Sequence, residues 1–129
     1  MNIPDNLLYT KEHEWVRIEG NKGIVGITDY AQNHLGDVTY VELPPKGKRI
    51  KQFEALASID SVKAASDIYA PLAGVVSEVN EELETASEKV NKDPYGAGWI
   101  VKIDIKDTGE KKNLMDAKAY KGYLESIKE

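Results

Sequence analysis

The sequence contains no cysteine among its 129 residues. Disulfide frameworks, thiolate zinc sites and any protein thiol acting as nucleophile or redox group are therefore excluded. Only two histidines are present, His13 and His34, which is too few for a catalytic zinc site unless carboxylates supply the remaining ligands. We expect no metal site, and if this protein takes part in thiol chemistry, the sulfur must come from another molecule.

Long apolar runs and an excess of positive charge are also missing. No stretch approaches the roughly 20 apolar residues of a membrane span, and the first eight residues carry no pattern of a signal or transit peptide. The net charge of −5, from 17 Lys and Arg against 22 Asp and Glu, argues against a general nucleic-acid binder. We therefore expect one cytoplasmic domain over residues 1–129, a monomer that binds neither nucleic acid nor membrane.

Conventional catalytic motifs are absent. The sequence has no Gly-x-Ser-x-Gly elbow, no His-Glu-x-x-His helix and no phosphate-binding loop that ends in Gly-Lys-Ser or Gly-Lys-Thr. The glycines at positions 20, 23 and 26 lie within a predicted hairpin, which is the wrong setting for a dinucleotide site. The motifs therefore point to no conventional catalytic site.

Short apolar runs with period-two alternation dominate the middle of the sequence. Residues 15–18 and 23–27 flank the turn signal Glu19-Gly20-Asn21 and predict an opening hairpin. Further strands are predicted at 38–43, 53–59, 68–69, 75–79 and 99–105. The fold class is therefore mainly β.

Two helices are predicted beside these strands. Thr28 is a suitable N-cap for a helix of two turns near residues 28–35, which ends at Gly36. Near the C-terminus, residues 120, 123, 124 and 127 repeat at helical spacing, and Asp116 is placed to cap the first turn. We expect this amphipathic C-terminal helix to pack back on the sheet.

A faint internal repeat joins the two halves of the sequence. Residues 23–25 resemble residues 74–76, and residues 55–60 resemble residues 99–104 in their alternation and their Ile-Asp end. Two copies of one β-unit predict two sheets packed face to face, and residues 61–71 are expected to connect the two halves of the sequence.

Two local patterns bear on function without deciding it. In Glu12-His13-Glu14, an extended backbone places two carboxylates on one face, either as solvated acids of a strand edge or as a small anionic patch that holds an ammonium group. Lys63 is a single long cationic side chain within residues 58–67, where small side chains are frequent. Considered by themselves, these residues leave Lys63 an ordinary solubilising lysine.

The ordered motifs of the chain resemble the glycine cleavage H-protein family from Tyr9 to about Leu124. Six blocks carry the resemblance: Glu12-His13-Glu14-Trp15-Val16, Gly26-Ile27-Thr28-Asp29-Tyr30-Ala31-Gln32, Leu35-Gly36-Asp37-Val38, Val41-Glu42-Leu43-Pro44, Ser61-Val62-Lys63-Ala64-Ala65-Ser66-Asp67-Ile68-Tyr69-Ala70-Pro71, and Asn91-Lys92-Asp93-Pro94-Tyr95-Gly96-Ala97-Gly98-Trp99. The resemblance implies a lipoyl-domain-like barrel-sandwich hybrid of two small antiparallel sheets, with a lipoyl-like core at about 22–105 and a C-terminal helix at about 114–127. It also implies that Lys63 lies on an exposed hairpin and carries covalent lipoic acid.

The family's role implies a carrier that catalyses no step alone. A pyridoxal-phosphate-dependent glycine decarboxylase loads an aminomethyl group on the lipoyl arm, a tetrahydrofolate-dependent aminomethyltransferase removes its carbon unit, and dihydrolipoyl dehydrogenase reoxidises the dithiol. Tethering raises the effective concentration of the sulfur at each visited site to roughly the millimolar range. The arm itself is attached by a lipoate ligase or a lipoyl or octanoyl transferase.

The resemblance also assigns residues around the arm. Glu14 and Asp67 match family positions near the loaded arm, and we assign them, together with Glu12, as acceptors for its ammonium group. Asp60 and Gly74 are assigned to recognition by the lipoylating enzyme. Asp60 departs from the family, in which Glu is usual three residues before the lysine.

Two alternatives to the glycine-cleavage carrier remain open. The same fold can act as a relay that accepts octanoyl or lipoyl groups on Lys63 and passes them to other lipoyl-dependent enzymes. It can also be an H-like scaffold that is never modified.

Overall fold

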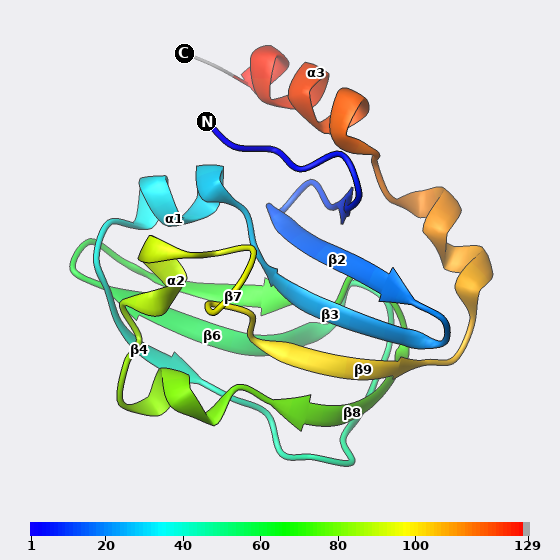
Figure 1. The fold of residues 1–129 in the computed structure, drawn as a ribbon, viewed down its shortest axis with the longest axis horizontal. Helices are drawn as coiled ribbons and strands as arrows, with labels where there is room; N and C mark the ends of the chain where they lie inside the picture. The colour runs from blue at the N-terminus through cyan, green and yellow to red at the C-terminus, as the bar shows by residue number, and fades with distance from the viewer. Residues whose placement is uncertain (128–129) are drawn as a thin grey trace.

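A computed structural model describes residues 1–127 of the chain and places two antiparallel sheets face to face. The larger sheet has six strands in the order β1-β2-β3-β9-β8-β5, and the smaller has three in the order β4-β6-β7 (Figure 1). The strands run over β1 Leu8–Tyr9, β2 Glu14–Glu19, β3 Lys22–Ile27, β4 Val38–Glu42, β5 Arg49–Ile50, β6 Ala55–Ser61, β7 Ala65–Tyr69, β8 Gly74–Val79 and β9 Val101–Ile105. The predicted fold class, including the opening hairpin β2–β3, is confirmed.

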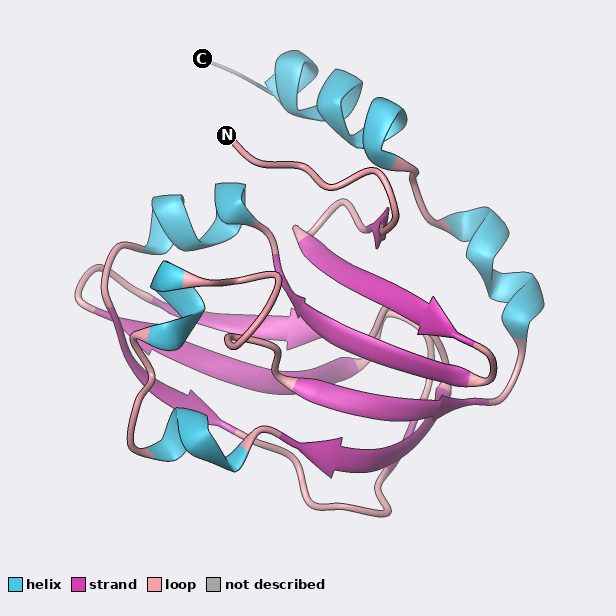
Figure 2. Cartoon of the chain, in the orientation of Figure 1, coloured by secondary structure: helices cyan, strands magenta, loops and turns pink. Residues whose placement is uncertain are grey.

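The helical segments lie around the edges of the two sheets, as Figure 2 shows. They are α1 Asp29–Leu35, α2 Lys89–Lys92, α3 Ala117–Ile127 and the 3₁₀ turns η1 Glu81–Glu84 and η2 Thr108–Asn113. None of the helices within residues 1–127 is long and apolar enough to cross a bilayer.

The predicted helix caps are present. The Thr28 hydroxyl accepts a hydrogen bond from the Ala31 N–H at 3.2 Å, and α1 ends at Gly36, whose φ of 73° favours glycine. The Asp116 carboxylate accepts from the Ala119 N–H at 2.8 Å in the first turn of α3. Each cap satisfies a backbone donor or acceptor that the helix itself leaves unpaired.

Apolar side chains from both sheets form the main core, which contains Val25, Ile59 and Ile103, all fully buried. A second cluster lies where α3 and the N-terminal segment cover the larger sheet: Leu7, Tyr9, Trp15, Ile24, Ala117 and Tyr120. The C-terminal helix therefore packs back on the sheet, as its apolar periodicity predicts.

Residues 61–71, predicted to connect the two halves of the sequence, also contribute a strand to the smaller sheet. Residues 65–69 form β7, which pairs with β6 inside the smaller sheet. The larger sheet in turn mixes both halves of the sequence, since β3 pairs with β9 and β5 with β8. Short strand motifs of similar sequence do not specify which strand each one will pair with.

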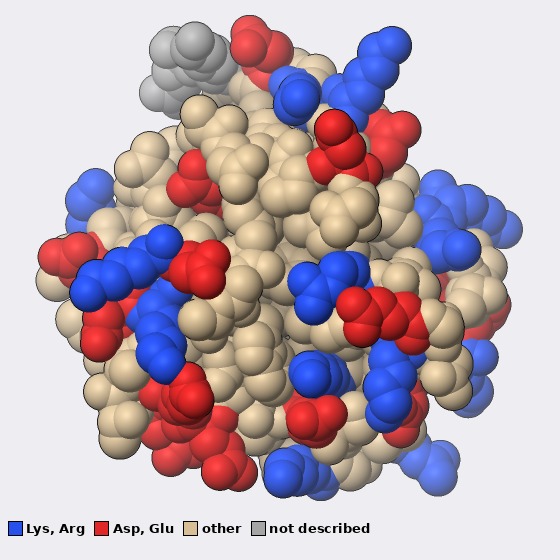
Figure 3. Space-filling model, in the orientation of Figure 1, with Lys and Arg blue, Asp and Glu red and all other residues tan. Residues whose placement is uncertain are grey.

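Charges of both signs alternate over the face of the larger sheet that Figure 3 shows. Two of the ion pairs join residues that lie directly opposite one another on neighbouring strands, Lys22 with Asp104 at 2.8 Å and Lys102 with Glu78 at 3.7 Å. Such exposed pairs stabilise a fold by less than about 1 kcal/mol each. They leave no field of a single sign on this face.

Candidate functional site

Lys63 lies at the turn between β6 and β7 and is exposed. The Ser61 hydroxyl organises the turn, because its oxygen accepts from the N–H groups of Lys63 (3.2 Å) and Ala64 (3.1 Å). The Ser61 N–H closes the turn on the Ala64 carbonyl at 2.8 Å. Among residues 1–127, no carboxylate lies within ion-pair distance of Lys63, so its amine is available to other molecules.

The aliphatic stem of Lys63 lies against the end of α1. A methyl group built on Gly36 would be 3.4 Å from Lys63 Cε and 3.4 Å from Val62 Cγ2. The Val62 N–H also donates to the Asp37 carbonyl at 3.0 Å. The hairpin tip is therefore held beside the helix cap, although the amine itself reaches solvent.

Asp60 and Asp67 share the solvent-facing side of the smaller sheet. Asp60 lies opposite Ala65, and Asp67 lies opposite Ser58 two residues further along the pair of strands. Side chains at this spacing point to the same face. Both carboxylates are exposed, so this face is negative beside the lysine.

Glu14 lies at the other end of β7 from the hairpin and is 1% exposed. Its carboxylate accepts hydrogen bonds from the Thr10 hydroxyl and, at 3.1 Å, from the Tyr69 N–H. Burial raises the pKa of Glu14 from its ordinary value of 4.5 to about 7, and these two hydrogen bonds oppose the rise. Because an ionised carboxylate offers about four acceptor positions, room remains for a further donor.

Glu12 is exposed and does not share a face with Glu14, so the extended arrangement predicted for residues 12–14 is wrong. The intervening His13 has a φ of 70°, which turns the chain and sends Glu14 inward. Glu12 instead lines a pocket of about 490 Å³ together with Thr10, Lys11, Phe53, Tyr69, Asn113 and Met115. Since Thr10 and Tyr69 also hydrogen bond to Glu14, the buried carboxylate adjoins this pocket.

His13 joins the C-terminal helix to α1, which the sequence did not indicate. Its Nδ1 lies 2.9 Å from the Tyr120 hydroxyl, and its ring lies 4.5 Å from the Tyr30 ring. Burial, with a smaller contribution from His34, lowers the pKa of His13 from 6.5 to about 4. His13 is thus a neutral packing residue at neutral pH. The exposed His34 stacks on Tyr30, in keeping with the structural part that its place in the helix suggests.

Gly74 is buried at the first position of β8, where it pairs with Ile105 of β9. A methyl group there would lie 2.1 Å from the Asp104 carbonyl oxygen, closer than any side chain permits. The close approach of two backbones therefore requires glycine at this position.

Chemically, the site combines an exposed primary amine with a buried acid further along the same strand. The four residue steps of β7 from Ala65 to Tyr69 span about 13 Å. Within residues 1–127, no group of three or more His, Asp or Glu side chains is placed to hold a metal ion. The arrangement suits a group that is attached at Lys63 and reaches along β7 towards the pocket.

Comparison with known proteins agrees with this arrangement. The family model for the glycine cleavage H-protein matches residues 7–127. The glycine cleavage system H protein of Symbiobacterium thermophilum is 52% identical over 122 residues, covering 95% of both chains, and one from Thermus thermophilus is 54% identical over 126 residues, covering 98% of both. The crystal structure of a glycine cleavage system H protein from Mycobacterium marinum superposes with a TM-score of 0.85 at 36% identity, over 93% of this chain and 97% of that one.

Proposed function

The chain belongs to the glycine cleavage H-protein family, and we propose that Lys63 is the residue through which it carries lipoic acid. Members of this family are lipoyl carriers of the glycine cleavage system and catalyse no reaction themselves. The observation that carries the proposal is the exposed Lys63 amine at a turn built by Ser61, free of ion pairs among residues 1–127. We also propose that residues 1–129 act as one carrier domain, a monomer in the cytoplasm.

The size of the site supports a long acyl group on the lysine. In a lysine that bears a C8 acyl chain with a terminal dithiolane ring, about eleven bonds separate the Cα atom from the ring. An extended chain spans about 3.8 Å per three bonds, so this distance is roughly 14 Å. This reach is similar to the length of β7, at whose far end Glu14 adjoins the pocket. When bound, the lipoyl group supplies a disulfide that can be reduced to a dithiol, chemistry that a cysteine-free chain lacks.

We propose Glu14 as the principal acceptor for an ammonium group carried on the arm. An approaching cation favours the ionised form of a carboxylate whose pKa burial has raised to about 7. The two hydrogen bonds that Glu14 already accepts fix its orientation. Asp67 on the outer face of β7 and Glu12 at the pocket add negative charge along the same path. Their shared task is to hold the loaded arm and to limit its contact with water.

Asp60 and Gly74 are proposed to govern attachment of the group by a lipoate ligase or by a lipoyl or octanoyl transferase. Asp60 is exposed on β6, three residues before Lys63, and can contact such an enzyme directly. Gly74 is buried, and its part is to preserve the β8–β9 approach and with it the shape that the enzyme meets.

The further partners proposed are the enzymes of the system: a glycine decarboxylase, an aminomethyltransferase and dihydrolipoyl dehydrogenase. Each must meet the group on Lys63, and the exposed hairpin lets a single lysine visit all three. Attachment to one carrier replaces diffusion of a free group between the three active sites.

Intact-mass measurement of the protein from its native cell tests the attachment. We expect an added mass of one C8 dithiolane acyl group, lost completely in Lys63→Arg. An unmodified native mass would contradict the proposal and favour the H-like scaffold. A saturated C8 acyl group in place of the dithiolane would favour the octanoyl relay.

The proposed part of Glu14 is tested on the loaded protein. Glu14→Gln keeps the side-chain shape and removes the charge, so the aminomethylated form should hydrolyse faster than the wild type. Glu12→Gln, a loss of the same charge at an exposed neighbour, is the matched control and should have the smaller effect. Equal lifetimes for wild type and Glu14→Gln would refute the assignment.

A further inference from the structure

The hairpin that carries Lys63 is connected to the short helix α2 through the loop that ends α1. Figure 1 shows α1 and α2 side by side at one end of the sheets. The loop touches the hairpin at two points, the Gly36 backbone beneath the Lys63 stem and the Asp37 carbonyl that accepts from the Val62 N–H. Any movement of this loop therefore moves the surface on which the lysine rests.

Asn91 of α2 holds this loop on both sides of Asp37. Its Oδ1 accepts from the Val38 N–H at 2.8 Å. Its Nδ2 donates to the Gly36 carbonyl at 2.8 Å and to Gln32 Oε1 at 3.1 Å. One amide side chain thus hydrogen bonds to a side chain in α1, to the carbonyl of its C-cap residue and to the N–H of the first residue of β4.

Asn91 is itself anchored. The neighbouring Val90 is fully buried in the main core, and the Asn91 N–H donates to the Glu88 carbonyl at 3.1 Å. The seven-residue α1, by contrast, contains no fully buried side chain. Isolated helices of this length are unstable in water, so the position of α1 depends on its partners.

We propose that Asn91 is a positioning residue for the lysine that the proposed function modifies. By bonding the loop on both sides of Asp37, it keeps Gly36 under the Lys63 stem and presents the hairpin to the acylating enzyme in one orientation. Preorganisation of this kind lowers the ordering cost of binding and acts on KM rather than on kcat. Asn91 touches neither the amine nor the pocket beside Glu14.

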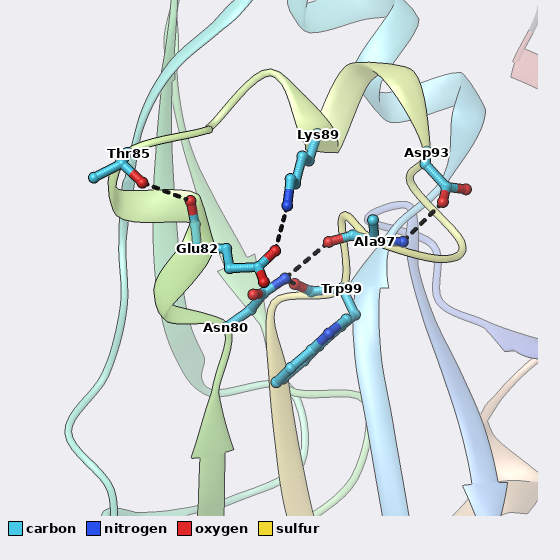
Figure 4. Close-up of polar contacts among 7 residues, drawn as sticks. All are labelled: Asn80, Glu82, Thr85, Lys89, Asp93, Ala97 and Trp99. Carbon is cyan, nitrogen blue, oxygen red and sulfur yellow. Dashed lines mark hydrogen bonds and ion pairs between the residues drawn. The ribbon is translucent and has the colours of Figure 1, made fainter.

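Asn80 provides a matched control. Asn80 lies at the same end of the molecule as Asn91, and the residue is 5% exposed. Its Nδ2 donates to the carbonyls of Ala97 (2.9 Å) and Trp99 (2.7 Å), as Figure 4 shows. None of its side-chain hydrogen bonds among residues 1–127 reaches the α1 loop or the hairpin. Asn80→Ala therefore destabilises the fold without releasing the loop.

Amide hydrogen exchange of the unmodified protein is the first measurement, with Ile103 in the core as the reporter of global stability. In Asn91→Ala we expect exchange of the Val62 amide to accelerate relative to the wild type. This acceleration should be at least about tenfold larger than the acceleration of the Ile103 amide in the same variant. In Asn80→Ala the Ile103 amide should exchange faster because global stability falls, and the Val62 amide should accelerate by no more than that factor. Asn91→Asp keeps an acceptor for the Val38 N–H but loses the donors to the Gly36 carbonyl and to Gln32. The Val38 amide should therefore stay protected from exchange, whereas the Val62 amide should exchange faster.

Acylation of Lys63 by a lipoate ligase, with lipoic acid and ATP as the probe, is the second measurement. We expect KM for the carrier to rise by about threefold or more in Asn91→Ala with kcat unchanged, and neither constant to change in Asn80→Ala. The inference is overturned if Val62 exchange follows Ile103 in Asn91→Ala, or if both asparagine variants raise KM equally. Neither result depends on whether native Lys63 carries lipoic acid, which the native mass tests separately.

Discussion

In the wild-type protein, the titrations of Glu14 and His13 have opposite effects on the free energy of unfolding. We expect Glu14→Gln to remove one of them and so to make stability depend on pH. Glutamine keeps the shape of the side chain and both hydrogen bonds, since its carbonyl can accept from the Tyr69 N–H and its amide can donate to the Thr10 hydroxyl. What the substitution removes is the titration of a buried acid.

The titration of Glu14 makes the fold less stable as pH rises. Its pKa is about 7 in the folded protein against an ordinary 4.5. Below pH 4.5 the carboxyl is protonated in both states, and the folded state has its full stability. Above pH 4.5 the unfolded chain ionises first, which costs about 1.4 kcal/mol of folding free energy per pH unit up to pH 7, at most roughly 3 kcal/mol in all.

His13 has the opposite effect over almost the same range. Its pKa is about 4 in the folded protein against an ordinary 6.5, because burial disfavours the charged ring. Above pH 6.5 the ring is neutral in both states. As pH falls towards 4, the unfolded chain binds the proton first, and the fold loses at most roughly 3 kcal/mol. Between pH 4.5 and 6.5 the contributions of His13 and Glu14 therefore cancel.

Urea unfolding at half-unit steps from pH 4.5 to 8 measures this cancellation. Relative to the wild type, Glu14→Gln should gain stability with rising pH by about 1.4 kcal/mol per unit up to pH 7. His13→Asn, which tolerates the left-handed φ, should show the reverse difference below pH 6.5. Parallel curves for Glu14→Gln and the wild type would refute the opposed titrations.

Three further substitutions test the packing around the site. Tyr120→Phe removes the hydroxyl that joins α3 to the α1 cap and should cost about 1–3 kcal/mol in urea unfolding, more than Tyr123→Phe, whose hydroxyl bond is exposed. Gly26→Ala places a methyl group 2.7 Å from the Trp15 ring, so it should lower stability by about 1–3 kcal/mol and shift the tryptophan fluorescence. Gly74→Ala should destabilise the protein at least as much and, because the added methyl group disturbs the β8–β9 approach, slow the acylation of Lys63; acylation at the wild-type rate would contradict the part proposed for Gly74.

Local chemistry accounts for the features that the sequence predicted well. Thr28 and Gly36 bound α1 because a hydroxyl N-cap and a left-handed glycine satisfy groups that any helix leaves unpaired. The opening hairpin follows from alternation around Gly20, whose φ is 64°. These preferences need no knowledge of distant residues.

Features that depend on long-range contacts were not predictable in the same way. His13 leaves the extended region because its ring bonds to Tyr120, 107 residues away, and packs on Tyr30. That single turn buries Glu14 and exposes Glu12, which alternation alone places on one face. Asn91 belongs to one of the motifs that carry the family resemblance, but its role was hidden because its partners lie 53 to 59 residues away.

Two helices outside the sheets, α2 and α3, hold the two ends of α1, the helix beside Lys63. At one end of α1 the Thr28 hydroxyl bonds to Tyr120 of α3 at 2.8 Å, and at the other end the Gly36 carbonyl accepts from Asn91 of α2. A helix too short to be stable alone is thus fixed by two others that pack on the sheets. Because the Lys63 stem rests on the held end, the two helices position the lysine in addition to adding buried side chains to the two apolar clusters. Loosening either end should therefore change how the lysine is presented before it unfolds the sheets.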